Sequence, residues 1–86
     1  MTHLWAEGHP LRVQTDSQGR PLRFTWQGRS HDLSQIRRRW QVQTDWWSEH
    51  GAVWRDYLAV TTNTGLFCVL YQDLYSEEWF LEKVYD

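Results

Sequence analysis

Polar and apolar residues alternate along two neighbouring stretches near the start of the chain. Apolar side chains occupy every second position in residues 11–13 and again in 22–26, and the residues between them, 16–21, are rich in turn formers. A period of two places successive side chains on opposite faces of a β-strand. The pattern therefore predicts a β-hairpin with one apolar face, and Gly28-Arg29 offers a tight turn after it.

The third segment, which follows this turn, combines two patterns. Leu33, Ile36 and Trp40 have the spacing of a helical face, whereas Ile36 and Trp40 also share the parity of a strand. A β-bulge near Ser34-Gln35 reconciles the two, because its extra residue changes which parity faces inward. We predict a bulged strand here, and the alternative is a single helical turn near 33–38.

The second half of the chain has a strong strand pattern. Residues 54–62 and 66–71 flank Asn63-Thr64-Gly65, which predicts a second hairpin. The stretch 66–71 is apolar on both parities, as expected for a central strand that is covered on both faces. After a polar turn, residues 79–85 predict a final strand.

The predicted fold class is all-β, with about six antiparallel strands in a strongly bent sheet or a small, partly open barrel of SH3-like or OB-like size. We expect a loose N-terminal arm at 1–8 and a single β domain at 9–86. The predicted core contains Phe24, Trp26, Trp40, Leu58, Val60, Phe67, Val69, Leu70 and Leu81.

The composition supplies such a core without covalent support. Seven Trp, four Tyr and three Phe stand in 86 residues, and the lone Cys68 excludes an intramolecular disulfide. No stretch reaches the length of a membrane span, and the first residues lack the basic and apolar regions of a signal peptide. The sequence therefore predicts a cytoplasmic protein that does not enter a membrane.

Charge is distributed unequally around a net value of −2. Residues 1–55 carry eight Arg against five acidic residues, whereas residues 56–86 carry one Lys against six. The Arg-rich half suits an anionic partner, because the guanidinium group pairs with carboxylates and phosphates in a bidentate manner. The alternative is that the two halves pair with each other across a folded sheet.

Catalytic and metal-binding arrangements are not recognisable in the sequence. His31 and Asp32 are adjacent, so on a strand they would point to opposite faces, and no nucleophile stands beside them. The acidic residues between 73 and 78 lack the spacing of a calcium loop, and the four His are scattered singly. We predict a protein that is not an enzyme and that needs no cofactor and no metal.

A binding surface is the more informative hypothesis, since aromatic and cationic residues cluster in the middle of the chain. Rings that stack bases beside cations that contact phosphates are typical of proteins that bind single strands. Trp, Tyr and Arg also dominate protein interfaces, and a terminal strand can offer an edge to a partner strand. The third interpretation is structural, with core rings under Arg side chains. The candidate binding residues are Arg37, Arg38, Arg39, Trp46, Trp47, Trp54 and Arg55.

Several short motifs spread over residues 9–86 recur in this interpretation. They include His9-Pro10, Gly19-Arg20-Pro21, Phe24-Thr25-Trp26-Gln27-Gly28-Arg29, Arg39-Trp40, Trp46-Trp47, Arg55-Asp56-Tyr57, Asp73-Leu74 and Trp79-Phe80-Leu81-Glu82-Lys83-Val84-Tyr85-Asp86. On these motifs the chain resembles a small, Trp-rich bacterial family of domains of unknown function. Residues 46–86 also resemble the C-terminal segment of ImuB-type proteins, which are catalytically inactive relatives of Y-family translesion polymerases.

The second resemblance implies a functional setting. ImuB-like proteins act in damage-induced mutagenesis with partner proteins and a sliding clamp, and their C-terminal regions serve as interaction platforms. The resemblance therefore implies a non-catalytic adaptor or accessory in bacterial DNA-damage tolerance, with a protein partner in a mutagenesis or repair complex. The alternative is a domain that binds single-stranded DNA or RNA through its Arg/Trp surface, and weak self-association is a further option. No functional residue is carried over, since the shared motifs have no established chemistry.

Overall fold

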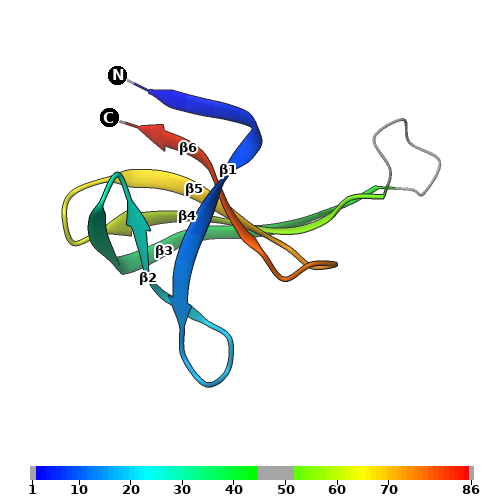
Figure 1. Cartoon of the computed structure of the whole chain (residues 1–86), viewed down its shortest axis with the longest axis horizontal. Helices are drawn as coiled ribbons and strands as arrows, with labels where there is room; N and C mark the ends of the chain where they lie inside the picture. Colours follow the sequence, from blue (N-terminus) through cyan, green and yellow to red (C-terminus); the bar gives the residue numbers. More distant parts are fainter. Residues whose placement is uncertain (1, 45–51, 86) are drawn as a thin grey trace.

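The computed structural model describes residues 2–44 and 52–85 of the chain, which form an all-β domain (Figure 1). Each strand pairs in antiparallel fashion with its neighbours in sequence, and the last strand pairs with the first, so that the sheet closes into a barrel. The strands are β1 (His3–Thr15), β2 (Pro21–Trp26), β3 (Arg29–Gln43), β4 (Trp54–Thr62), β5 (Phe67–Asp73) and β6 (Trp79–Tyr85). The prediction of an all-β fold with six antiparallel strands is confirmed.

The bulged strand predicted for the third segment is also confirmed. β3 runs without interruption through residues 33–38, and its register against β4 shifts between Leu33 and Gln35 and again between Ile36 and Arg38. The alternative of a helical turn near 33–38 is therefore wrong. The bulges explain the spacing: the first inserts one residue between Leu33 and Ile36, which both face inward, and the second places Trp40 on the outer face.

The N-terminal segment differs from the loose arm expected at 1–8, since β1 begins at His3. His3 and Leu4 pair with β6, and the strand then bulges before pairing resumes at His9. Within the bulge, the hydroxyl group of Tyr71 donates a hydrogen bond of 2.9 Å to the carbonyl oxygen of Glu7. The segment lacks a period of two because the bulge interrupts it, which hid the strand from the sequence pattern.

The interior of the barrel holds the main hydrophobic core. Its eight members come from strands β2, β4, β5 and β6, and partly buried rings of Trp5 and Trp79 pack against them. The buried members are Phe24, Trp26, Leu58, Val60, Cys68, Leu70, Leu81 and Val84. Burial raises the pKa of the Cys68 thiol to about 12, so this group is a protonated core side chain near neutral pH.

A second apolar cluster lies on the outer face of the sheet, and we call its four aligned rings the outer aromatic row. Trp40, Tyr57, Tyr71 and Phe80 stand directly opposite one another on β3, β4, β5 and β6. Successive ring centroids are 5.3, 5.1 and 5.0 Å apart. The predicted single core is thus divided, because Trp40, Phe67 and Val69 belong to this outer cluster and the first two are only partly buried.

Both faces of the central strand are covered, as the apolar run at 66–71 predicts. Cys68 and Leu70 face the barrel interior, whereas Val69 and Tyr71 face the outer cluster, and all four are buried.

The described part of the chain contains no helix that could cross a membrane.

Candidate functional site: the free edge of β3 and the end crevice

One side of β3 forms an accessible edge of the barrel. β2 has six residues and β3 has fifteen, so β2 pairs only with the beginning of β3, from Arg29 to Asp32. From Leu33 to Gln43 β3 pairs with β4 alone. Among the described residues no strand covers the other side of this stretch, which leaves a row of backbone N–H and C=O groups as a free sheet edge. In Figure 1 this part of β3 extends with β4 beyond the rest of the barrel.

The free edge carries the three consecutive arginines, and the pleat of the strand separates them. Arg39 lies opposite the core residue Leu58 and therefore faces inward, whereas Arg38 lies opposite Ala59 and faces outward. Arg37 is the extra residue of the second bulge and is exposed. Bulges and charges are the usual means by which proteins protect an edge strand.

A crevice opens at the end of the barrel where the turn joins β1 to β2. It lies between this turn and the free edge of β3. We call it the end crevice. It encloses about 220 Å³ and its walls include Pro21, Ile36, Leu58 and Trp79. Ile36 is 46% exposed, although it stands opposite the fully buried Val60. The apolar side of the end crevice is therefore an incompletely covered continuation of the core.

Charged groups form the polar side of the end crevice. Arg39 and Asp56 both line it, and the guanidinium group donates to the two carboxylate oxygens at 3.2 and 2.5 Å. The hydrogen bond to Asp56 raises the pKa of Arg39, and the attraction between the charges adds to this. Asp56 is 8% exposed, and a buried carboxylate without a positive partner destabilises a fold. The guanidinium group of Arg39 supplies the positive charge.

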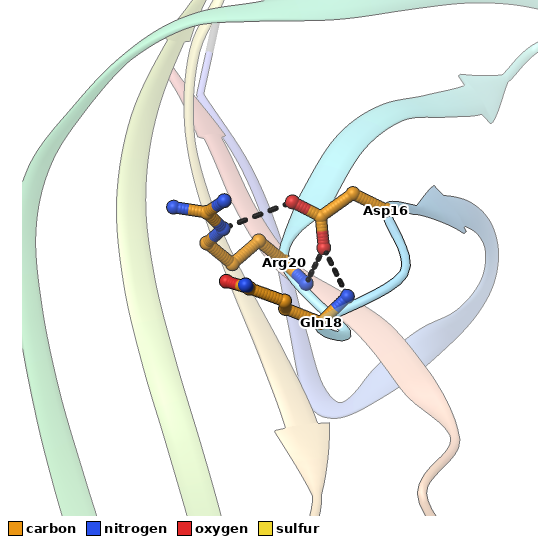
Figure 2. A network of polar contacts seen from close by, with 3 residues as sticks. All are labelled: Asp16, Gln18 and Arg20. Carbon is orange, nitrogen blue, oxygen red and sulfur yellow. Dashed lines mark hydrogen bonds and ion pairs between the residues drawn. The ribbon is translucent and has the colours of Figure 1, made fainter.

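The opposite wall of the end crevice is the β1–β2 turn, which Asp16 holds in place (Figure 2). One carboxylate oxygen accepts hydrogen bonds from the backbone N–H groups of Gln18 and Arg20 at 2.8 and 2.9 Å. The other accepts from Nε of Arg20 at 2.9 Å. The backbone hydrogen bond from Arg20 is the largest of the effects that together lower the pKa of Asp16.

This geometry predicts that Asp16 contributes to the stability of the fold in a pH-dependent way. Its pKa is lower in the folded than in the unfolded chain, so its contribution is present above the unfolded value and is lost as the pH falls through the folded value. Denaturant unfolding of the wild type and of Asp16→Ala, at neutral pH and at strongly acidic pH, measures the effect. The difference between the two proteins should be largest at neutral pH and shrink in acid, and a difference independent of pH would contradict the assignment.

The structure describes five of the seven predicted binding residues, and they do not form one surface. Trp46 and Trp47 lie outside the described residues. Trp54, the first residue of β4, packs against Tyr75, with the ring centroids 5.6 Å apart. The three consecutive arginines stand on the free edge of β3, where Arg39 faces inward and Arg38 faces outward, and Arg55 shares the outer face with Arg38.

On the outer face the cations cover aromatic rings. The guanidinium carbon of Arg38 lies 5.3 Å from the ring centroid of Trp40, and that of Arg55 lies 4.5 Å from that of Tyr71. Arg55 also donates a hydrogen bond of 3.3 Å to the hydroxyl group of Tyr57, which stands opposite Tyr71. Tyr57 and Tyr71 are 7% and 2% exposed, so their faces are not available to stack a base. This arrangement matches the structural interpretation, in which Arg side chains lie over packed rings.

Two further sequence hypotheses can be compared with the geometry. The C-terminal strand β6 pairs with β5 on one side and with β1 on the other, so it is the closing strand rather than the expected edge. His31 is buried, whereas Asp32 is exposed and pairs with Arg23 at 3.1 Å, so the two adjacent residues do not face each other. Within residues 2–44 and 52–85, no three His, Cys, Asp or Glu side chains come together in a metal-binding group.

Sequence reasoning missed the end crevice and the buried Asp56. The crevice brings together segments far apart in the chain, and no local pattern marks it. A signal for Asp56 existed, because this acid occupies the inward parity of a strand whose next inward residues are Leu58 and Val60. A charge at such a position requires a partner.

Comparison with known proteins gives one match. The family model described as a domain of unknown function, DUF6504, matches residues 6–86. No curated protein and no solved structure matches the chain.

Proposed function

Since the chain belongs to the DUF6504 family, whose description names no activity, we propose from the geometry that it is a non-catalytic binding module, an adaptor that receives an extended segment of a partner protein along the free edge of β3. The observation that carries this proposal is the stretch Leu33–Gln43, which lacks a strand partner on one side among the described residues. A strand added there would satisfy exposed backbone donors and acceptors, and its alternate side chains would determine specificity.

The surroundings of the edge define the chemistry of the partner. Inward side chains of an added strand would reach the end crevice, whose wall includes Ile36, Pro21 and Trp79. Outward side chains would lie near Arg37 and Arg38, which make no ion pair with the described residues. The partner is therefore an extended segment in which apolar and acidic residues alternate.

The edge at the other end of the sheet is less suited to this role. The beginning of β1, from His3 to Leu11, also pairs on one side only, with β6. Pro10 lacks a backbone N–H group there, and pairing with β6 is irregular over the whole stretch between Leu4 and His9, whereas the two bulges of β3 end at Arg38 and its pairing with β4 is regular from Arg38 to Gln43. These features favour β3 as the docking edge.

A synthetic peptide of about nine residues in which glutamate and valine alternate tests the proposal. Calorimetric titration should show binding to the wild-type protein, and the affinity should fall roughly tenfold in Arg37→Glu, because an attraction becomes a repulsion. Arg12→Glu is the matched control, since Arg12 lies on β1 opposite Thr25, outside the edge. Equal binding of a peptide with lysine in place of glutamate, or an equal loss in the two variants, would contradict the proposal.

A mixed-sequence single-stranded oligonucleotide distinguishes the nucleic-acid alternative in the same assay. Binding through phosphates should weaken with salt, with a log–log slope of about −0.7 per phosphate neutralised. The net charge of −2 and the burial of the Tyr57 and Tyr71 rings favour the protein partner. Salt-sensitive oligonucleotide binding without peptide binding would reverse this choice.

The sequence resemblance supports a setting for this module. Residues 46–86 resemble the C-terminal segment of ImuB-type proteins, so we propose that the adaptor acts in the bacterial cytoplasm in DNA-damage tolerance. Affinity purification from damaged cells, with Arg37→Glu as the control bait, tests this setting. A repair or replication protein should be recovered with the wild type and reduced with the variant, and recovery of metabolic enzymes alone would refute the setting while leaving the peptide result intact.

A further inference from the structure

A pocket of about 210 Å³ lies at the other end of the barrel, where the β2–β3 and β4–β5 turns meet the beginning of β1. Its wall includes His3, Trp26, Gln27, Arg29, His31 and Thr64. For scale, an enclosed cavity of about 150 Å³ can hold benzene. No described residue of its wall has a carboxylate side chain, and Trp26, Gln27 and Arg29 bring hydrogen-bond donors to it.

His31 is the least usual group in this wall. It is 4% exposed, and its ring lies against Phe24 with the centroids 5.2 Å apart. Nδ1 lies 2.7 Å from the hydroxyl oxygen of Thr64, whereas the buried Nε2 has no hydrogen-bond partner. A buried polar atom without a partner costs about 1–3 kcal/mol, so most such atoms in proteins are satisfied by a residue, a water or a ligand.

A chain of hydrogen bonds favours one of the two tautomers of the neutral His31 ring. The backbone N–H of Leu66 donates to the hydroxyl oxygen of Thr62, which lies 2.9 Å from that of Thr64. If each hydroxyl donates onward, Thr62 donates to Thr64 and Thr64 donates to Nδ1, and every bond in the chain is made. In this order Nδ1 is an acceptor, so the neutral ring carries its hydrogen on Nε2, which is then a donor.

Arg29 adds a positive charge to the same wall. Arg29 is exposed and makes no ion pair with the described residues. The arginines that do so are Arg20, Arg23 and Arg39. Among the described residues, the pocket therefore combines a ring N–H without a hydrogen-bond partner, a guanidinium group without an ion pair and the side-chain amide of Gln27. Hydrogen-bond donors and a cation, with no acidic side chain among the described wall residues, are the complement of an oxyanion.

We propose that this pocket binds a small oxyanion, a carboxylate or phosphate group, which accepts a hydrogen bond from Nε2 of His31 and pairs with Arg29. Nε2 is shielded from solvent in the free protein, so the wall side chains must move aside as the oxyanion enters. Trp26 is one of these side chains and has its own indole signal. The site is separate from the end crevice, and the proposal does not depend on peptide binding there.

Nuclear magnetic resonance of the histidine ring nitrogens tests the proposal in two steps. In the free protein the tautomer of the neutral His31 ring should be the one with the proton on Nε2. Titration with sodium phosphate or with sodium acetate should then shift the Nε2 and Trp26 indole signals in a saturable way, and sodium chloride at equal ionic strength should not. If only one salt saturates the shifts, the result identifies which of the two groups, phosphate or carboxylate, the pocket binds. If both do, the pocket is a general oxyanion site.

Two variants exclude a general salt effect. Arg29→Gln should weaken the oxyanion affinity about tenfold, because a charge-assisted hydrogen bond is lost. Arg12→Gln removes the same charge from β1, outside the pocket, and should leave the affinity unchanged. The absence of saturable shifts with both salts, or an equal response of the two variants, would overturn the proposal, and spectra with native dispersion establish that each variant is folded.

Discussion

Phe24→Ala is expected to lower the free energy of unfolding by about 3–5 kcal/mol, the usual cost of truncating a buried aromatic side chain. Phe24 is 1% exposed and lies at the centre of the inner core. A domain of this size has a total stability of roughly 4–13 kcal/mol, so the variant should be unfolded or only marginally folded. Denaturant unfolding followed by circular dichroism measures the change.

Leu22→Ala is the matched control for this variant. Leu22 stands two residues earlier on the same strand, but it is 48% exposed. Its truncation removes little buried surface and should change the stability by well under about 1 kcal/mol. Similar losses in the two variants would mean that the core is not where the structure places it.

Gly8→Ala is expected to destabilise the protein by about 2–5 kcal/mol, from backbone strain of about 1–2 kcal/mol and overpacking of about 1–3 kcal/mol. Gly8 has a φ of +78°, which side chains rarely adopt. A Cβ atom there would overlap the hydroxyl oxygen of Tyr71 and lie 2.9 Å from Cβ of Phe80. Because the bulge at Gly8 lets β1 pair with β6, the variant should loosen the closure of the barrel.

Gly65→Ala separates the two contributions. Gly65 has a similar φ of +87°, but apart from Gly65 and its two chain neighbours no atom of the described residues lies within 4 Å of the position that a Cβ would occupy. In this variant the free energy of unfolding should fall only by the contribution from backbone strain, about 1–2 kcal/mol. Thermal unfolding of both proteins gives the comparison, and an equal loss would show that Tyr71 and Phe80 do not approach Gly8 closely.

The strands were predictable from the sequence because their signals are local. The period of two marks the first hairpin, and the doubly apolar run at 66–71 marks the central strand. The closure of the barrel was not predictable to the same degree. It depends on the pairing of His3–Leu11 with β6, where a bulge removes the local period and the partner lies at the other end of the chain.

The candidate site was predictable in its residues but not in its arrangement. The sequence drew attention to Arg37, Arg38 and Arg39 as one basic cluster. Strand parity places Arg38 on the ring of Trp40 and Arg39 on Asp56, which lie on opposite faces of the sheet. Their shared feature is the free edge of β3, which exists because β2 is much shorter than β3 and which appears only once the strands are paired.

Amide hydrogen exchange along β3, with and without the alternating glutamate–valine peptide, tests the docking edge most directly. Backbone N–H groups that point away from β4 should exchange fast in the free protein, because no described strand covers that side. If the partner strand adds to this edge, the peptide should slow alternate amides between Leu33 and Gln43 and leave the amides of β6 unchanged. Protection confined to β6 or to the outer aromatic row, or no protection at a saturating peptide concentration, would contradict the account.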